Sequence, residues 1–163
     1  MLPHLDAAYN LARWLTRDPQ DAADVVQDAM LRGLRFFGTY RGTNAKAWLL
    51  TIVRNTAYSW MKANRRYGSD IGEGVSFEDF VSDIASPAED PEETLIRTGV
   101  RHDLDRLIEG LPAEFRECLV LREIEDLSYK EIAQVTGVPI GTVMSRLARA
   151  RRLLQRGWVE AEA

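Results

Sequence analysis

Apolar side chains recur at helical spacing through most of the chain. Between Pro19 and Phe37 they fall near a period of about 3.6 residues, which is typical of an amphipathic helix with one face toward a core. The positions on this face are Ala22, Val25, Val26, Ala29, Met30, Leu34 and Phe37. Comparable patterns predict helices over residues 5–15 and 44–66, with the glycine-containing stretch 38–43 as a loop. The pattern therefore predicts a three-helix module in residues 1–66.

The second half of the chain has the same kind of pattern. Apolar periodicity, broken by short polar or glycine- and proline-containing stretches, predicts helices over 91–109, 112–124, 128–136 and 140–156. No alternating strand pattern of useful length occurs in the sequence. We therefore expect an all-α fold of two small helical modules, with the second in residues 91–163.

Two helix starts carry the same local signal. Asp18-Pro19 and Asp90-Pro91 each place a side-chain acceptor at the N-cap and a proline at the first helical position. Asp21 and Glu93 follow at the third helical position, where the helix dipole favours a carboxylate.

The stretch between the modules differs in composition. Residues 67–90 contain three glycines, four serines and a heavy load of acids, which predicts an acidic flexible linker. Several apolar residues are scattered through it, so two possibilities stay open: part of it docks on a module or partner, or all of it is a solvated tether.

Charge is unevenly distributed along the 163 residues. The net charge is −4, yet residues 1–66 carry +5, residues 67–98 carry −8 and residues 99–163 carry −1. Between Pro139 and Trp158 there are five arginines and no acid. Basic surfaces are therefore expected at two separate places, despite the acidic total.

Several classes of function have little support. Cys118 is the single cysteine, so no disulfide can form within one chain, and the two histidines lack a metal-ligand spacing. We expect no metal, no cofactor and no catalytic site, because no nucleophile, paired carboxylates or glycine-rich phosphate loop can be assembled. No apolar run reaches the roughly 18 residues of a membrane helix. The N-terminus lacks a secretion signal, so we expect a cytoplasmic protein without membrane insertion.

Residues 128–147 contain the sharpest local motif. Ser128 and Glu131 form a capping box, Ala133 permits a close helix crossing, and Gly137 can supply the positive φ that ends a helix before a tight turn. The shared apolar seam is Ile132, Val135, Val138, Val143 and Leu147. This pattern predicts a helix-turn-helix, whose second helix enters the DNA major groove.

The outward face of that second helix has the chemistry for DNA binding. Its residues are Gly141, Thr142, Ser145, Arg146 and Arg149, with Arg151 and Arg152 beyond them. The first positions can reach base edges or phosphates, and the later arginines add charge toward phosphates. The alternative is a basic surface helix with no nucleic-acid partner.

The helix predicted over 44–66 combines cations with aromatic rings. Lys46, Arg54 and Lys62 alternate with aromatic residues, among them Trp48 and Tyr58. An unpaired DNA strand needs both, because cations follow the phosphates and rings receive exposed bases. Trp48 has an alternative role in core packing, because its neighbours Leu49 and Ile52 are apolar residues typical of a core.

Asp24, Gln27 and Asp28 share one face of the helix predicted over 19–37. Taken alone, such a stripe is more simply the solvated side of an amphipathic helix.

Four motifs in this order resemble the extracytoplasmic-function (ECF) group of bacterial sigma factors, in the sigma-70 family. They are Asp21-Ala-Ala-Asp-Val-Val-Gln-Asp28, Ala47-Trp-Leu-Leu-Thr-Ile-Val-Arg-Asn55, Leu111-Pro112 and Pro139-Ile-Gly-Thr-Val-Met-Ser-Arg-Leu147. The resemblance covers nearly the whole chain apart from the 67–90 linker.

The resemblance implies a division of labour between the modules. The first would be region 2, which binds the β′ clamp helices of core RNA polymerase and opens the promoter −10 element. The second would be region 4, which binds the −35 element and the β flap. The linker would run toward the RNA exit path, and a separate anti-sigma factor would regulate the chain.

The resemblance also assigns residues to three surfaces. Asp24, Gln27 and Asp28 would face core polymerase, which reverses the simpler interpretation of that stripe. The −10 surface, with the loop that captures a flipped base, would comprise Tyr40, Arg41, Lys46, Arg54, Asn55, Tyr58, Lys62 and Arg65. The −35 surface would comprise Gly141, Thr142, Ser145, Arg146 and Arg149.

Two rival functions remain open at this level. A simple dimeric helix-turn-helix regulator would need only the second module and leaves the first module's surfaces unexplained. A sigma-mimicking adaptor that binds an anti-sigma factor would not need the arginine-rich recognition helix.

Overall fold

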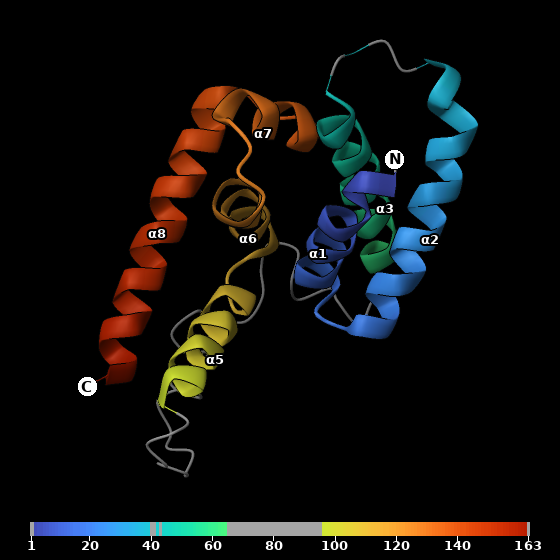
Figure 1. Cartoon of the computed structure of the whole chain (residues 1–163). Helices are drawn as coiled ribbons and strands as arrows, with labels where there is room; N and C mark the ends of the chain where they lie inside the picture. The colour runs from blue at the N-terminus through green and yellow to red at the C-terminus, as the bar shows by residue number, and fades with distance from the viewer. Residues whose placement is uncertain (1, 40–41, 43, 65–95, 163) are drawn as a thin grey trace.

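The computed structural model describes residues 2–39, 42, 44–64 and 96–162, and these residues are helical with short connections (Figure 1). The first module contains three long helices: α1 (Leu5–Thr16), α2 (Pro19–Phe36) and α3 (Ala45–Asn64). The second contains α5 (Ile96–Glu109), α6 (Ala113–Leu119), α7 (Tyr129–Thr136) and α8 (Ile140–Glu162). No strand occurs in these ranges, and the predicted all-α class is confirmed.

Local signals define the helix ends as predicted. The Asp18 carboxylate accepts the backbone N–H groups of Gln20 and Asp21 at 2.8 and 3.0 Å, which caps α2. The Asp90 cap and the 67–90 linker lie outside the described residues. Short 3₁₀ turns over Leu2–His4 and Phe37–Thr39 precede α1 and follow α2.

The three helices of the first module pack on one another around fully buried apolar side chains. Leu11 and Leu15 of α1, Val25 of α2, and Leu50 and Val53 of α3 have no exposed surface. Trp48 is half-buried and packs against this core, and the Phe37 ring meets it edge to face at 5.9 Å between centroids.

One feature of α2 differs from the sequence prediction. Leu34 and Phe37 were expected on the core face, but they are 64% and 51% exposed. The reason is that α2 continues past the part of the bundle that could cover it, so the end of its apolar stripe faces outward.

The second module contains the predicted helix-turn-helix. The Ser128 hydroxyl accepts the Glu131 N–H at 3.1 Å, and the Glu131 carboxylate accepts the Ser128 N–H at 2.8 Å. Gly137 ends α7 with φ at +76°. The seam residues Val143 and Leu147 of α8 are buried against the rest of the module. The capping box and the turn are both confirmed.

The helix α6 continues into a single π-helical stretch, Val120–Ile124, before the chain turns toward α7. Asp126 in this turn adopts a positive φ of 59°. This irregular segment carries the chain from the centre of the second module to the side that faces α3.

The two modules lie against each other (Figure 1). Helix α7 packs on α3, and α6 packs on α1. The Arg116 guanidinium, which is fully buried, donates to the carbonyl oxygens of Leu111 and Glu109 in its own module and of Leu15 in the first, at 2.7, 3.0 and 3.3 Å. The buried apolar side chains form one cluster that runs through both modules.

Candidate functional site

Five of the residues predicted for the −10 surface are described, and all five lie on α3. Lys46, Arg54 and Tyr58 are half-buried, whereas Asn55 and Lys62 are exposed. Tyr40, Arg41 and Arg65 lie outside the described residues. The half-buried side chains are the ones that face the second module.

Arg54 and Tyr58 meet the buried carboxylate of Glu117 on α6. Arg54 donates through Nε to Oε1 at 2.8 Å and through Nη2 to Oε2 at 3.1 Å, and the Tyr58 hydroxyl donates to Oε2 at 3.1 Å. The Arg54 guanidinium also lies over the Tyr58 ring, 4.1 Å from its centroid. A two-pronged arginine–carboxylate pair is the strongest common form of ion pair.

Burial changes the ionisation of both acidic groups. It raises the pKa of the Glu117 carboxyl above its ordinary value, although the hydrogen bonds and charge of Arg54 act in the opposite direction. Burial, and then the charge of Glu117, raises the pKa of the Tyr58 hydroxyl, which stays protonated as a donor. Burying these charges costs solvation free energy, so the cluster is stable only when every charged group in it is paired.

Two further acids of the second module contact the beginning of α3. The Lys46 ammonium lies 3.4 Å from the Glu125 carboxylate and donates to the Glu125 carbonyl oxygen at 2.9 Å. The Asn44 side-chain amide donates to the Glu131 carboxylate, and Asn10 on α1 donates to Glu125 at 3.5 Å. Glu125 is 7% exposed. Acidic side chains thus line the side of the second module that covers α3.

The predicted −35 surface lies on the first three turns of α8. Gly141, Ser145 and Arg149 are exposed, and Thr142 is half-buried. The Ser145 hydroxyl donates to the Thr142 carbonyl oxygen at 3.1 Å.

Two of the predicted −35 side chains also contact α6. Arg146 is half-buried and lies 3.9 Å from the Glu114 carboxylate, and the Arg149 guanidinium lies 5.8 Å from the centre of the Phe115 ring. Arg146 therefore has a partner inside the module, while Ser145 and Arg149 present more of their surface to solvent.

Exposed apolar residues on the same helix were not predicted. Ile140 and Met144 are 44% and 48% exposed at the start of α8. Apolar side chains here can contact thymine methyl groups in a major groove. The sequence did contain a sign of them, because both residues are apolar but neither belongs to the predicted apolar seam of the helix-turn-helix.

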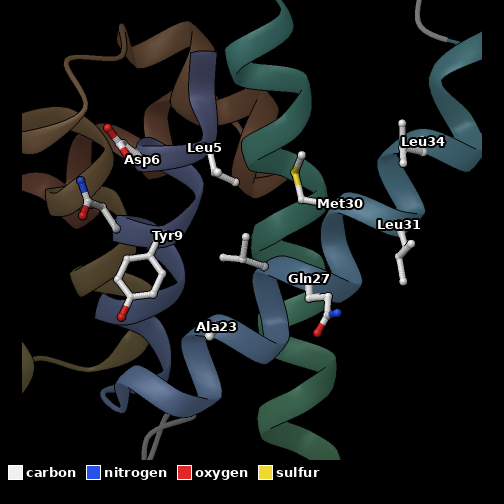
Figure 2. A pocket seen from close by; sticks show the side chains of 10 residues that line it. Leu5, Asp6, Tyr9, Ala23, Gln27, Met30, Leu31 and Leu34 are labelled. Atoms are coloured by element: carbon white, nitrogen blue, oxygen red, sulfur yellow. The ribbon is translucent and has the colours of Figure 1, made fainter. Parts of the chain in front are cut away.

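An apolar groove runs between α1 and α2 (Figure 2). Leu5 and Tyr9 line its α1 side, and Leu31 and Leu34 on α2 are 62% and 64% exposed. The remaining lining includes Ala23, Val26, Gln27 and Met30. An exposed apolar strip with a polar border is typical of a surface that binds another protein.

The three residues predicted to face polymerase lie along this side of α2. Gln27 lines the groove, Asp24 is exposed, and Asp28 pairs with Arg32 at 3.4 Å. The apolar part of the surface was not predicted, because Leu34 had been assigned to the core face and Leu31 had no assigned role.

Two other features, a metal-ion cluster and a membrane-spanning helix, are absent from the described residues. Within 2–39, 44–64 and 96–162, no group of three or more histidine, cysteine, aspartate or glutamate side chains is placed to hold a metal ion. None of the helices described here has the length and apolarity required to cross a bilayer.

Comparison with known proteins places the chain in a family. Residues 2–67 match the family model of sigma-70 region 2, and residues 101–154 match that of sigma-70 region 4. The RNA polymerase sigma-H factor of Pseudomonas aeruginosa is 38% identical over 144 residues, which cover 85% of this chain and 74% of the relative. The ECF RNA polymerase sigma-E factor of Escherichia coli K12 is 37% identical, over 82% and 72%.

A solved structure is also similar over nearly the whole chain. It is the sigma factor RpoE of Bartonella quintana, crystallised in complex with the anti-sigma factor NepR. The TM-score is 0.71 at 31% identity, and the match covers 96% of this chain and 92% of the other. The resemblance predicted from four motifs is confirmed: this chain belongs to the ECF group of the sigma-70 family of RNA polymerase sigma factors.

Proposed function

We propose that this chain binds core RNA polymerase, directs it to a two-part promoter and opens the DNA at the −10 element. The observation that carries the proposal is that both sigma regions occur in order in one chain, with an exposed apolar groove on the first and an exposed recognition helix on the second. A simple DNA-binding regulator has no use for the groove.

The groove between α1 and α2 is the proposed docking surface for the β′ clamp helices. Leu31 and Leu34 supply exposed apolar area, and Asp24, Gln27 and Asp28 supply a polar and acidic border. This combination suits a helical partner with apolar side chains flanked by basic ones.

The −10 element is proposed to bind along α3 and the loop before it. Lys46, Arg54 and Lys62 provide cations for phosphates, while Asn55 and Tyr58 provide hydrogen bonds and a ring. Tyr40, Arg41 and Arg65 complete the proposed surface from outside the described residues. Binding energy alone drives the opening of the strands, and the polymerase carries out the chemistry.

The −35 element is proposed to bind the recognition helix α8. Ser145 and Arg149 are exposed there, with Gly141 allowing close approach of the backbone, and Thr142 and Arg146 alongside. Base readout by Arg146 would require it to leave Glu114, 3.9 Å away. The β flap is the proposed polymerase partner of this second module.

An anti-sigma factor is the remaining proposed partner. The similar Bartonella chain was crystallised with one, and regulation by such a protein would suit a chain that acts on polymerase and chromosomal DNA in the cytoplasm.

Binding to sigma-free bacterial core polymerase tests the proposal. Wild-type chain and the variants Leu34→Asp and Leu34→Met are compared by fluorescence anisotropy. Leu34 is 64% exposed, so neither change disturbs the core. Leu34→Asp should weaken binding at least tenfold, about 1.4 kcal/mol, because it places a charge in an apolar contact, whereas Leu34→Met should bind like wild type. Equal binding of all three proteins would reject the groove as the docking surface, and no binding by wild type would favour a plain DNA-binding regulator.

A further inference from the structure

Two rows of exposed residues lie next to each other on the outer side of α8. Helix α8 is at the edge of the molecule, and α5, α6 and α7 pack along its other side (Figure 1). Residues four positions apart are neighbours on a helix surface, so the first two turns carry one apolar row and one polar row. The exposed members are Ile140, Met144 and Ala148 in the apolar row, and Gly141, Ser145 and Arg149 in the polar row.

Arg146 belongs to neither row, because its side chain turns toward α6. The side chain is 22% exposed, and its guanidinium lies 3.9 Å from the Glu114 carboxylate. Burial raises the pKa of the Glu117 carboxyl and of the Cys118 thiol, and the charge of Arg146 acts in the opposite direction on both. The guanidinium therefore lies beside the buried side of α6, and the two rows are what α8 presents to a ligand.

Met144 occupies the middle of the apolar row, one turn after Ile140. The N-terminal turns of a recognition helix meet base edges in the major groove, where the thymine methyl group is the apolar feature. Resting on the proposed function, the geometry points to Met144 as a specificity-determining residue that selects a thymine in the −35 element through its methyl group. Ile140 extends the apolar contact along the groove.

The chemistry of the Met144 side chain separates thymine from the other bases. A thioether is flexible and polarisable, and it has no hydrogen-bond donor for the acceptors of guanine or adenine. Burying the amino group of cytosine or adenine against it leaves that group without a partner, which costs free energy. A methyl group pays no such cost, while Ser145 and Arg149 in the polar row supply the hydrogen bonds that Met144 lacks.

The contact removes apolar surface from water on both partners. Met144 is 48% exposed and Ile140 is 44% exposed, so the chain leaves this surface hydrated until DNA covers it. Burial of one methyl group changes a binding constant about fourfold. This is enough to favour thymine at one position, and it is small enough that the polar row is still needed for affinity.

Replacing thymine with deoxyuridine tests the proposal, because it removes the methyl group and leaves base pairing unchanged. Duplexes are selected from a randomised double-stranded DNA library by the full chain, alone and bound to core polymerase. Each thymine of the selected element is then replaced in turn. Fluorescence anisotropy compares wild type, Met144→Ala and the control Val159→Ala. Val159 is also an exposed apolar residue of α8, at 59%, but it lies near the far end of the helix.

We expect one thymine at which uracil weakens the binding of wild type and of Val159→Ala about fourfold. Met144→Ala should bind the thymine and uracil duplexes equally at that position. The proposal is overturned if uracil has no effect at any thymine, if Met144→Ala discriminates as wild type does, if Val159→Ala loses discrimination, or if no duplex is selected.

Core polymerase binding by the same three proteins separates this proposal from the sigma function. Weaker polymerase binding by Met144→Ala, with unchanged discrimination between thymine and uracil, would assign the apolar row to a protein contact and overturn the proposal. Normal polymerase binding without discrimination by wild type would reject only the reading of thymine. Discrimination by a chain that does not bind polymerase would support the reading of thymine and reject only the sigma function.

Discussion

Arg116 and Glu117 are adjacent on α6, both are fully buried, and each meets the cost of burial differently. Arg116 donates to backbone carbonyl oxygens, two in its own module and one in the first. Glu117 accepts from the side chains of Arg54 and Tyr58, both in the first module. One buried charge is therefore paired with backbone carbonyl oxygens, and its neighbour is paired with side chains.

Replacing Arg116 tests the structural role. Arg116→Ala should lower the free energy of unfolding by about 2–4 kcal/mol, because it leaves carbonyl oxygens without a donor and a cavity in their midst. Arg116→Lys should recover little of this loss, since one ammonium cannot replace a planar fork. Urea unfolding measures both, with exposed Arg152→Ala as the control near wild type. A loss below about 1 kcal/mol for Arg116→Ala would contradict this role.

Cys118 should be chemically inert in the folded chain. Burial, followed by the charge of Glu117, raises the pKa of its thiol from an ordinary 9.0 to about 12. Because the folded pKa is the higher one, the thiol stays protonated until pH rises well above 9, and at pH 8 the reactive thiolate is about a thousandfold rarer than in the unfolded chain. Iodoacetamide labelling at pH 8 should therefore be at least a hundredfold slower without urea than in urea. Similar rates in both conditions would show that the thiol is accessible.

At the residue scale, the helix that carries the candidate −10 side chains was predictable, whereas the surroundings of those side chains were not. Lys46, Arg54 and Tyr58 were selected correctly as residues that share α3, but a sequence gives no sign that acids 59 to 79 positions away would meet them. Leu34 was misplaced because periodicity identifies an apolar face without indicating where the covering helices end.

Helix ends in this chain are determined by short-range signals. Asp18 caps α2, and the Ser128–Glu131 box caps α7, each through hydrogen bonds within three residues. Because such bonds need no distant partner, the predicted start of each of these helices agrees with the structure. The π-helical stretch Val120–Ile124 has no comparable local signal and was predicted as ordinary helix.

The two glycines flanking the helix turn should respond oppositely to alanine. Gly137 has φ at +76°, where a Cβ is strained, so Gly137→Ala should cost about 1 kcal/mol of unfolding free energy. Gly141 lies in a helix, and a Cβ there would meet nothing within 4 Å, so Gly141→Ala should be neutral or stabilising by up to about 1 kcal/mol. Thermal unfolding of both variants measures the difference. Equal losses would mean that backbone conformation is not what distinguishes these positions.

At the scale of the whole molecule, the placement of the modules was not predictable. The sequence indicates two helical units and an acidic stretch between them, and it leaves their relative position open. The structure joins them through contacts between residues 63 and 101 positions apart: the Arg54–Glu117 ion pair and the hydrogen bond from Arg116 to the Leu15 carbonyl oxygen. Contacts of that range depend on how complete surfaces fit together, which no local pattern encodes.

The continuous buried cluster predicts that both modules unfold together. Trp158 is the single tryptophan of residues 91–163, so the fluorescence of Trp158→Phe reports the first module alone, while circular dichroism reports all helices. The two urea transitions of this variant should coincide, as for one cooperative unit. Midpoints that differ clearly would mean that the modules unfold independently.

Transcription by reconstituted polymerase tests the sigma function most directly. Sigma-free bacterial core polymerase is incubated with a genomic fragment library, with and without the purified chain, and transcript start sites are mapped. The account predicts defined starts that appear only with the chain and share an upstream motif in two parts, one for each module. Absence of such starts despite normal binding to core polymerase would contradict it.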